Sequence, residues 1–129
     1  MIYEVVSPIY GFEDVKKMEL TKVDDTFFSL KNCDDDKPTF TLVNPFAFRE
    51  YEFDLPDTLT NDLEIDDVQD VSVLNIMVVA TPIEDSRINF AAPLIFNTKN
   101  KKLGQMILNE MKYEEYGLAE KLSDYLKKD

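Results

Sequence analysis

The sequence predicts a mainly β protein built as a single domain, and three observations support this prediction. Between Val71 and Leu108, three apolar runs rich in β-branched residues are joined by short polar links. Such links suit an antiparallel sheet, because parallel strands need long crossovers. The chain has 129 residues, 44% of them hydrophobic, which is enough for one packed core. Neither a linker nor an internal repeat divides it, so residues 1–129 are expected to form one domain.

The first third of the chain alternates short extended segments with turns. Met1–Val6 is the first expected strand. Gly11–Met18 is expected to form a single helical turn, because apolar residues recur in it at three-residue spacing. A turn that needs positive φ is the simplest role for Gly11. Further strands are expected at residues 19–23, 26–31 and 39–43.

Asn44-Pro45 interrupts the strand pattern, and the segment Phe46–Asp54 then alternates aromatic with acidic side chains. This alternation predicts an extended segment with Tyr51 and Phe53 on one side. The segment is the candidate protein-binding surface, because aromatic side chains anchor interfaces and charges steer encounter. The alternative is that its aromatic residues belong mostly to the core. The candidate residues are Phe46, Phe48, Arg49, Glu50, Tyr51, Glu52, Phe53 and Asp54.

Two helices are expected outside the sheet. A short one follows Pro56 and carries Leu59 and Leu63. Residues 110–129 are expected to form a C-terminal amphipathic helix that extends a β core of residues 1–109. This helix either docks on the domain's own sheet or reaches for a partner. Its apolar face would comprise Leu118, Leu122, Tyr125 and Leu126.

Four amide side chains lie within or beside the apolar runs. A buried amide needs hydrogen-bond partners, so we expect these residues to tie down backbone inside the fold rather than to touch a partner. They are Asn75, Asn89, Asn97 and Gln105.

Acidic residues dominate the charge of the chain. Against 14 Lys and Arg there are 26 Asp and Glu, which gives a net charge of −12. Residues 1–98 carry −13 and residues 99–129 carry +1, and the stretch Glu50–Asp70 holds nine acids and no base. Such a field repels phosphate backbones and attracts basic partners, so direct nucleic-acid binding is not expected. The alternative is a surface charge that serves solubility alone.

The residue types also narrow the classes of function. The chain has no histidine, and its single thiol, Cys33, adjoins three acids that disfavour a thiolate. Three scattered glycines make no phosphate-binding loop. Asp34–Asp36 lacks the alternating acids of a calcium loop. A hydrolase using two carboxylates and a calcium-dependent module stay open as alternatives, but a binding protein without metal, cofactor or catalytic residues is expected.

The sequence predicts a cytoplasmic protein. No apolar stretch reaches the roughly 18 residues that a membrane span requires. The start Met1-Ile2-Tyr3-Glu4 is not a signal peptide, and a single cysteine excludes an intramolecular disulfide bond.

Six short motifs occur in order between residues 3 and 109. They are Gly11-Phe12-Glu13-Asp14, Asn44-Pro45-Phe46, Tyr51-Glu52-Phe53, Val73-Leu74-Asn75-Ile76, Asn89-Phe90-Ala91-Ala92-Pro93-Leu94-Ile95-Phe96-Asn97 and Gln105-Met106-Ile107-Leu108. The last two carry most of the specificity. In this order and spacing, the motifs resemble the FliW family of flagellar assembly factors.

The resemblance implies a small, mainly antiparallel, β-barrel-like protein that is monomeric alone and binds proteins in the cytoplasm. Members of the family bind the RNA-binding translational repressor CsrA and relieve its repression of flagellin mRNA. They also bind flagellin, so that free flagellin titrates the factor away. Antagonism of CsrA by blocking its RNA face and antagonism by coupling from another face both stay open. A flagellin-specific chaperone without direct CsrA antagonism is the alternative function.

Overall fold

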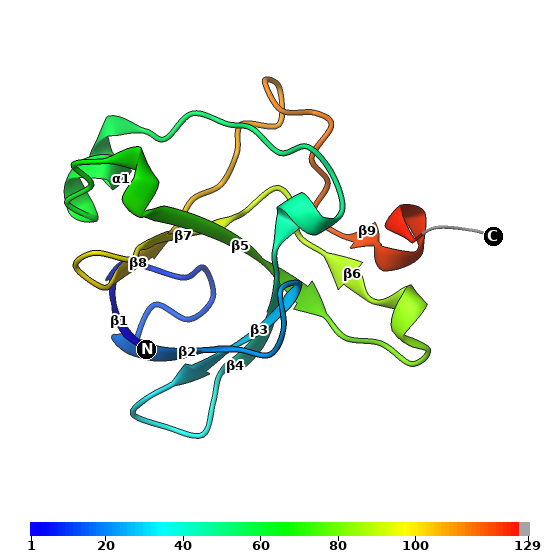
Figure 1. Ribbon diagram of the computed structural model, residues 1–129, viewed down its shortest axis with the longest axis horizontal. Coiled ribbons are helices and arrows are strands. Elements are labelled where there is room, and N and C mark those ends of the chain that lie inside the picture. The colour runs from blue at the N-terminus through cyan, green and yellow to red at the C-terminus, as the bar shows by residue number, and fades with distance from the viewer. Residues whose placement is uncertain (127–129) are drawn as a thin grey trace.

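Most of the strands form a closed barrel. The computed structural model describes residues 1–126, and within them nine strands make one continuous sheet (Figure 1). The strands are β1 (Ile2–Ser7), β2 (Lys17–Lys22), β3 (Phe27–Asn32), β4 (Thr39–Val43), β5 (Val71–Val78), β6 (Arg87–Ile88), β7 (Leu94–Asn97), β8 (Lys102–Gln105) and β9 (Glu120–Lys121). The helices are η1 (Pro45–Ala47), α1 (Asp57–Asp62), η2 (Val68–Asp70), η3 (Ile83–Asp85) and η4 (Leu122–Tyr125), of which all but α1 are 3₁₀-helices.

Seven strands close the barrel, in the order β1-β2-β3-β4-β5-β7-β8. Neighbours pair antiparallel except at one seam, where β1 runs parallel to β8 with Glu4 opposite Lys102. The pairing of β4 with β5 places Val43 opposite Asn75. The mainly β, antiparallel and barrel-like fold predicted above is therefore confirmed, and β1–β8 is its one parallel pair among the described strands.

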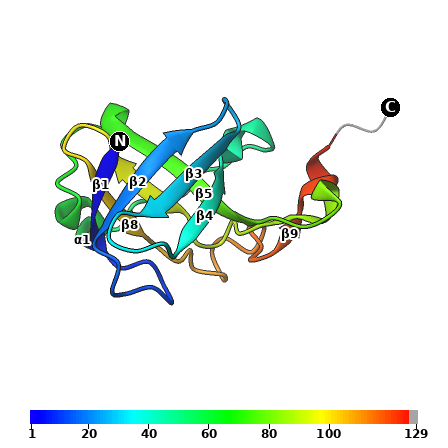
Figure 2. The same ribbon diagram turned by 90° about the horizontal axis from the view of Figure 1, so that it is seen from below.

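The predicted meander between Val71 and Leu108 is present with one change. β5 pairs with β7, and β7 pairs with β8, both antiparallel. The second apolar run is not one strand, because the side-chain oxygen of Asn89 accepts hydrogen bonds from the backbone N–H groups of Ala91 and Ala92. The start of this run belongs to β6, which pairs with the far end of β5 and with β9. Figure 2 shows this extension leaving the barrel on one side.

Two apolar cores lie on opposite sides of the barrel wall. In β7, Leu94 and Phe96 belong to the inner core and Ile95 to the outer one, as the alternation of strand side chains requires. The outer core is covered by α1, by the chain after β4 and by the chain after β8 (Figure 1). All four residues of β7 are buried because both of its faces are covered.

The expected short helix after Pro56 is confirmed as α1. Leu59 within it and Leu63 just after it are both buried in the outer core. The helix lies close to the β1–β8 seam, where a Cβ atom on Gly104 would lie 2.8 Å from the Cβ of Ser7 and 3.0 Å from Cδ1 of Leu59. Because Gly104 has no side chain, β1 and α1 can both lie close to β8 at this position.

The prediction of an extended segment from Phe46 to Asp54 is wrong. Asn44 caps η1 by accepting a hydrogen bond from the backbone N–H of Phe46 at 3.1 Å, and Pro45 occupies the start of the helix, so β4 ends there. In the described chain, residues 48–55 then continue without strand pairing. Within them, the backbone N–H groups of Glu52 and Asp54 donate to side chains of the C-terminal region instead.

The expected C-terminal amphipathic helix is also wrong for residues 110–126, while residues 127–129 lie outside the described part. Turns, β9 and η4 occupy this region. Leu122 is 3% exposed, but Leu118 is 69% exposed, so the expected apolar face does not exist. The backbone bonds instead to distant residues, with Gly117 accepting from the N–H of Phe90 at 2.9 Å.

The N-terminal turn differs in detail from its prediction. Gly11 has a φ of +87°, which confirms the expected turn glycine. The single helical turn expected at residues 11–18 is replaced by two successive turns, closed by hydrogen bonds from Phe12 to Ile9 and from Val15 to Phe12. Among the helices in residues 1–126, none is long and apolar enough to cross a membrane.

Candidate protein-binding surface

A strap formed by residues 109–126 crosses the outer face of the barrel. On one side it pairs with residues 86–91, through the β6–β9 ladder and a hydrogen bond from Leu122 to Ser86 of 2.8 Å. On the other side, tyrosine hydroxyls of the strap accept hydrogen bonds from the segment 46–54. The N–H of Glu52 donates to Tyr116 at 2.9 Å and that of Asp54 donates to Tyr113 at 3.0 Å. The strap therefore joins two segments that are distant in sequence.

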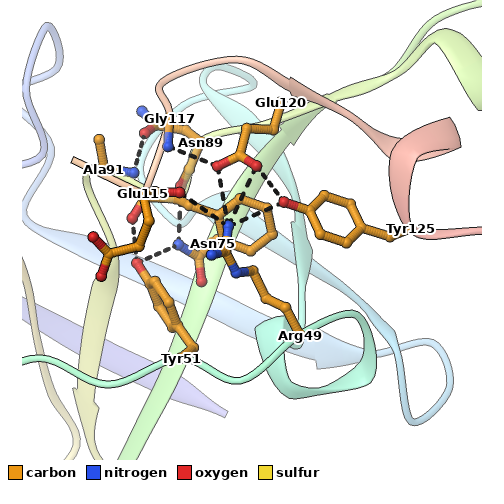
Figure 3. Close-up of polar contacts among 10 residues, drawn as sticks. Arg49, Tyr51, Asn75, Asn89, Ala91, Glu115, Gly117, Glu120 and Tyr125 are labelled. Carbon is orange, nitrogen blue, oxygen red and sulfur yellow. Dashed lines mark hydrogen bonds and ion pairs between the residues drawn. The ribbon is translucent and has the colours of Figure 1, made fainter. Parts of the chain in front are cut away.

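Arg49 anchors the strap at its centre. Its guanidinium donates to the Glu115 carbonyl at 3.2 Å, to both carboxylate oxygens of Glu120 at 3.3 Å and to the Tyr125 hydroxyl at 3.0 Å (Figure 3). The same group lies 4.8 Å from the ring centre of Tyr116, within cation–π range. The Arg49–Glu120 pair is about one-fifth exposed. Arg49 thus acts within the domain rather than as a free surface charge.

Burial and the carboxylate change the acidity of one strap tyrosine. The Tyr125 hydroxyl donates to Glu120, which also accepts from the N–H of Gly117 at 2.6 Å. Burial and, next to it, the hydrogen bond to Glu120 together raise the pKa of Tyr125 to about 12. The hydroxyl therefore stays protonated and keeps donating to the carboxylate across the physiological range.

Tyr51 fixes the segment 46–54 to the barrel wall. Its hydroxyl donates to the Phe90 carbonyl and accepts from the Asn75 amide at 3.1 Å, while the same amide also donates to the Asn89 carbonyl at 2.9 Å (Figure 3). Burial raises the pKa of Tyr51 far above its usual range. The expectation that the amides tie down backbone is confirmed for Asn75 and Asn89. It also holds for two further amides, Asn97 and Gln105.

An apolar groove of about 660 Å³ opens where the segment 46–54 meets the strap. Its apolar lining comes from the segment, from η2 and β5, and from Tyr113 of the strap. At its edges, Phe46 is 59% exposed and Val68 is 79% exposed. The residues that line this apolar groove are Phe46, Tyr51, Glu52, Phe53, Asp54, Leu55, Val68, Val71, Val73, Lys112 and Tyr113.

A second, acidic groove of about 690 Å³ lies on the other side of the segment. Glu50, Glu52 and Glu115 line it, and Arg49, its one basic lining residue in the described chain, is paired with Glu120. The two grooves share Phe46, Tyr51 and Glu52, of which Phe46 and Glu52 are exposed and Tyr51 is buried. One face of the molecule thus presents an exposed aromatic ring between an apolar and an acidic hollow.

Comparison with known proteins identifies the family. The family model described as FliW protein matches residues 1–122. The chain belongs to the FliW family.

Relatives in this family resemble the chain along almost its whole length. It is 48% identical to Flagellar assembly factor FliW of Sulfurimonas denitrificans, over 99% of this chain and 100% of that protein. It is also 48% identical to Flagellar assembly factor FliW 2 of Wolinella succinogenes, over 100% of this chain and 95% of that protein. A crystal structure of the flagellar assembly factor FliW superimposes with a TM-score of 0.87 at 29% identity, covering 99% of this chain and 88% of that one.

Of the eight candidate residues of this FliW-family chain, four are exposed and four are buried or half-buried. Phe46, Glu50, Glu52 and Asp54 are exposed. The other four, Phe48, Arg49, Tyr51 and Phe53, are buried or half-buried and hold the segment in place.

Sequence reasoning missed the part of this surface that comes from other elements. Val68 lies within the acid-rich stretch Glu50–Asp70, between Asp67 and Gln69. An apolar residue among so many charged ones was the signal in the sequence that could have identified it, and it is exposed in the structure. Tyr113 and Tyr116 were missed because the region was assigned to a helix. Within residues 1–126, no group of three or more His, Cys, Asp or Glu side chains is placed to hold a metal ion.

Proposed function

We propose that this chain is a non-enzymatic, cytoplasmic regulator of flagellar assembly that binds and antagonises CsrA and is itself titrated by flagellin. The role in flagellar assembly is supported by two relatives that are named flagellar assembly factors and that match this chain along almost its whole length. The two partners are those that the family resemblance implies.

The observation that carries the proposal is the face with two grooves. It places the exposed ring of Phe46 beside Glu50, Glu52 and Asp54, the first acids of the stretch Glu50–Asp70, which holds nine acids and no base. RNA-binding proteins carry basic surfaces, and a negative field accelerates their encounter with an acidic partner. A repressor that binds RNA therefore fits the charge of this face better than an acidic or neutral protein does.

The test is calorimetric titration of this protein with CsrA and, separately, with flagellin from the same organism, at low and at physiological salt. Saturable binding to CsrA that weakens as salt rises is expected, because salt screens exposed charges. Flagellin added to the complex should release CsrA, and the released CsrA should again repress translation of flagellin mRNA in a cell-free reaction.

Two results would contradict the proposal. Binding to flagellin without measurable affinity for CsrA would favour the flagellin-specific chaperone. No heat with either partner, in a sample shown to be folded by circular dichroism, would exclude both functions.

A further inference from the structure

The apolar groove has the features of a pocket that receives one side chain of a protein partner. Its volume of about 660 Å³ leaves room for an apolar side chain together with the residues beside it. Val68, at 79% exposed, and Phe46, at 59%, are its least covered apolar residues. Interfaces take much of their binding energy from anchors that fill such pockets.

Charge selects the kind of partner. The groove belongs to a face on which acidic residues outnumber basic ones, and the chain as a whole carries −12. A second copy of the chain would bring the same negative face and be repelled. Phosphorylated ligands and anionic lipid head groups would be repelled for the same reason. A segment with an apolar side chain next to lysine or arginine is complementary to both parts of the face.

One ion pair lies at the edge of the apolar groove. Lys112 of the strap contacts Asp54 at 3.0 Å, and both side chains are mostly exposed. The hydrogen bond to Asp54 raises the pKa of Lys112. Among the described residues that line the groove, Lys112 carries the one positive charge. A cation from a partner that approaches Asp54 must therefore compete with Lys112.

We propose that the apolar groove receives an apolar side chain from a basic segment of the repressor, and that a neighbouring cation of this segment replaces Lys112 at Asp54. This inference rests on the function proposed above and adds to it the docking site and the chemistry of the segment that docks. Lys112 acts as an internal competitor that limits the affinity.

The proposed contact between the groove and an apolar side chain is tested with Val68→Lys, which places a charged side chain at the edge of the groove. The matched control is Val23→Lys, because Val23 is similarly exposed at 68%, lies outside the groove and gives the same change in net charge. We expect CsrA to bind Val68→Lys about tenfold or more weakly than wild type, the cost of losing an interface anchor. Val23→Lys should bind as tightly as wild type to within about twofold, since surface substitutions away from such features have small effects.

The proposed replacement of Lys112 by a cation of the partner is tested with Lys112→Gln, which removes the ion pair with Asp54. Its matched control is Lys22→Gln, because Lys22 and Asp25 form an exposed ion pair of 2.9 Å outside the groove. Lys112→Gln should tighten CsrA binding by about two- to fivefold at low salt, the size expected for an exposed ion pair. Lys22→Gln, with the same change in net charge, should leave the affinity unchanged.

The outcomes separate this inference from the function on which it rests. If wild type does not bind CsrA, the proposed function fails and the inference falls with it. If wild type binds CsrA but Val68→Lys and Val23→Lys bind equally well, the function stands and the docking site is wrong. Loss of flagellin binding alone in Val68→Lys would also overturn the inference, because it would assign the groove to the other partner. Thermal melts of all four variants establish that each is folded.

Discussion

Arg49 links the strap to the barrel through charge and aromatic contacts together. Its guanidinium pairs with Glu120 and lies within cation–π distance of the rings of Phe90, Tyr116 and Tyr125. Removal of one partner from a well-covered ion pair is costly because the other charge is left unpaired. Since Glu120 stays partly exposed, solvent reduces this cost.

We therefore expect Arg49→Ala to lower the free energy of unfolding by about 2 kcal/mol. It should also speed amide hydrogen exchange in residues 110–126. Arg87→Ala is the matched comparison, because Arg87 is exposed and donates one hydrogen bond to the strap, to the Ala119 carbonyl at 2.9 Å. That substitution should cost less than about 1 kcal/mol. Equal losses in the two variants, measured by urea denaturation, would contradict the anchoring role of Arg49.

Tyr51 gives the protein a pH dependence in the alkaline range. Its pKa in the folded state is raised by burial above the ordinary value of about 10, so the fold favours the protonated hydroxyl. The resulting stability is fully present below about pH 10 and is lost as pH rises above it. Tyr51→Phe should lower the free energy of unfolding at neutral pH by about 1–3 kcal/mol, because the Phe90 carbonyl loses its donor.

Urea denaturation from about pH 8 to pH 11 measures this effect. In Tyr51→Phe, the decline of stability toward high pH should be shallower than in wild type. Tyr10→Phe, at an exposed tyrosine, is the control and should leave the decline unchanged. A decline of identical slope in wild type and Tyr51→Phe would show that the Tyr51 hydroxyl does not carry the linkage.

At the scale of elements, the parallel seam between β1 and β8 depends on a missing side chain. A Cβ atom at Gly104 would meet the Cβ of Ser7, an atom close to the backbone that cannot rotate away. Gly104→Ala should therefore lower the free energy of unfolding by about 1–3 kcal/mol, as overpacking does. In a Ser7→Gly background the same substitution should cost clearly less. An equal cost in both backgrounds, from a double-mutant cycle, would locate the strain elsewhere.

Elements fixed by local pattern were predictable, and those fixed by distant partners were not. The strand 39–43 and the helix after Pro56 depend on local alternation and on a local proline, and both are present. The parallel seam joins β1 to β8, whose pairing no local pattern contains. The strap shows the same limit, because its hydrogen bonds go to residues 49–54 and 86–91. The apolar residues at helical spacing in the strap do not form one buried face.

The protein-binding role of residues 46–54 stays a prediction, and the structure adds that this segment lines two grooves together with residues from other elements. The aromatic and acidic pattern of residues 46–54 identified the segment that lines both grooves. It could not identify Val68, Tyr113 or Tyr116, because these reach the grooves from η2 and the strap. It also could not distinguish exposed Phe46 from buried Tyr51, since both are aromatic residues in the same short segment.

At the scale of the whole molecule, the position of charge matters more than its sum. The net charge of −12 includes acids on the groove face and acids in the loop after β3. Steering of a partner depends on the field where the partner docks, and salt screens charges beyond about 10 Å. Two variants with the same net charge can therefore differ in their rate of association.

We expect the triple variant Glu50→Gln, Glu52→Gln and Glu115→Gln, which neutralises the acidic groove, to bind CsrA more slowly than wild type by about tenfold. Its association rate should also depend less on salt. The control is the triple variant Asp34→Asn, Asp35→Asn and Asp36→Asn, whose exposed loop lines neither groove and whose net charge changes equally. Stopped-flow association at several salt concentrations compares them. If both triple variants slowed association equally, the total charge of the molecule would steer the partner, and the grooved face would have no special part in encounter.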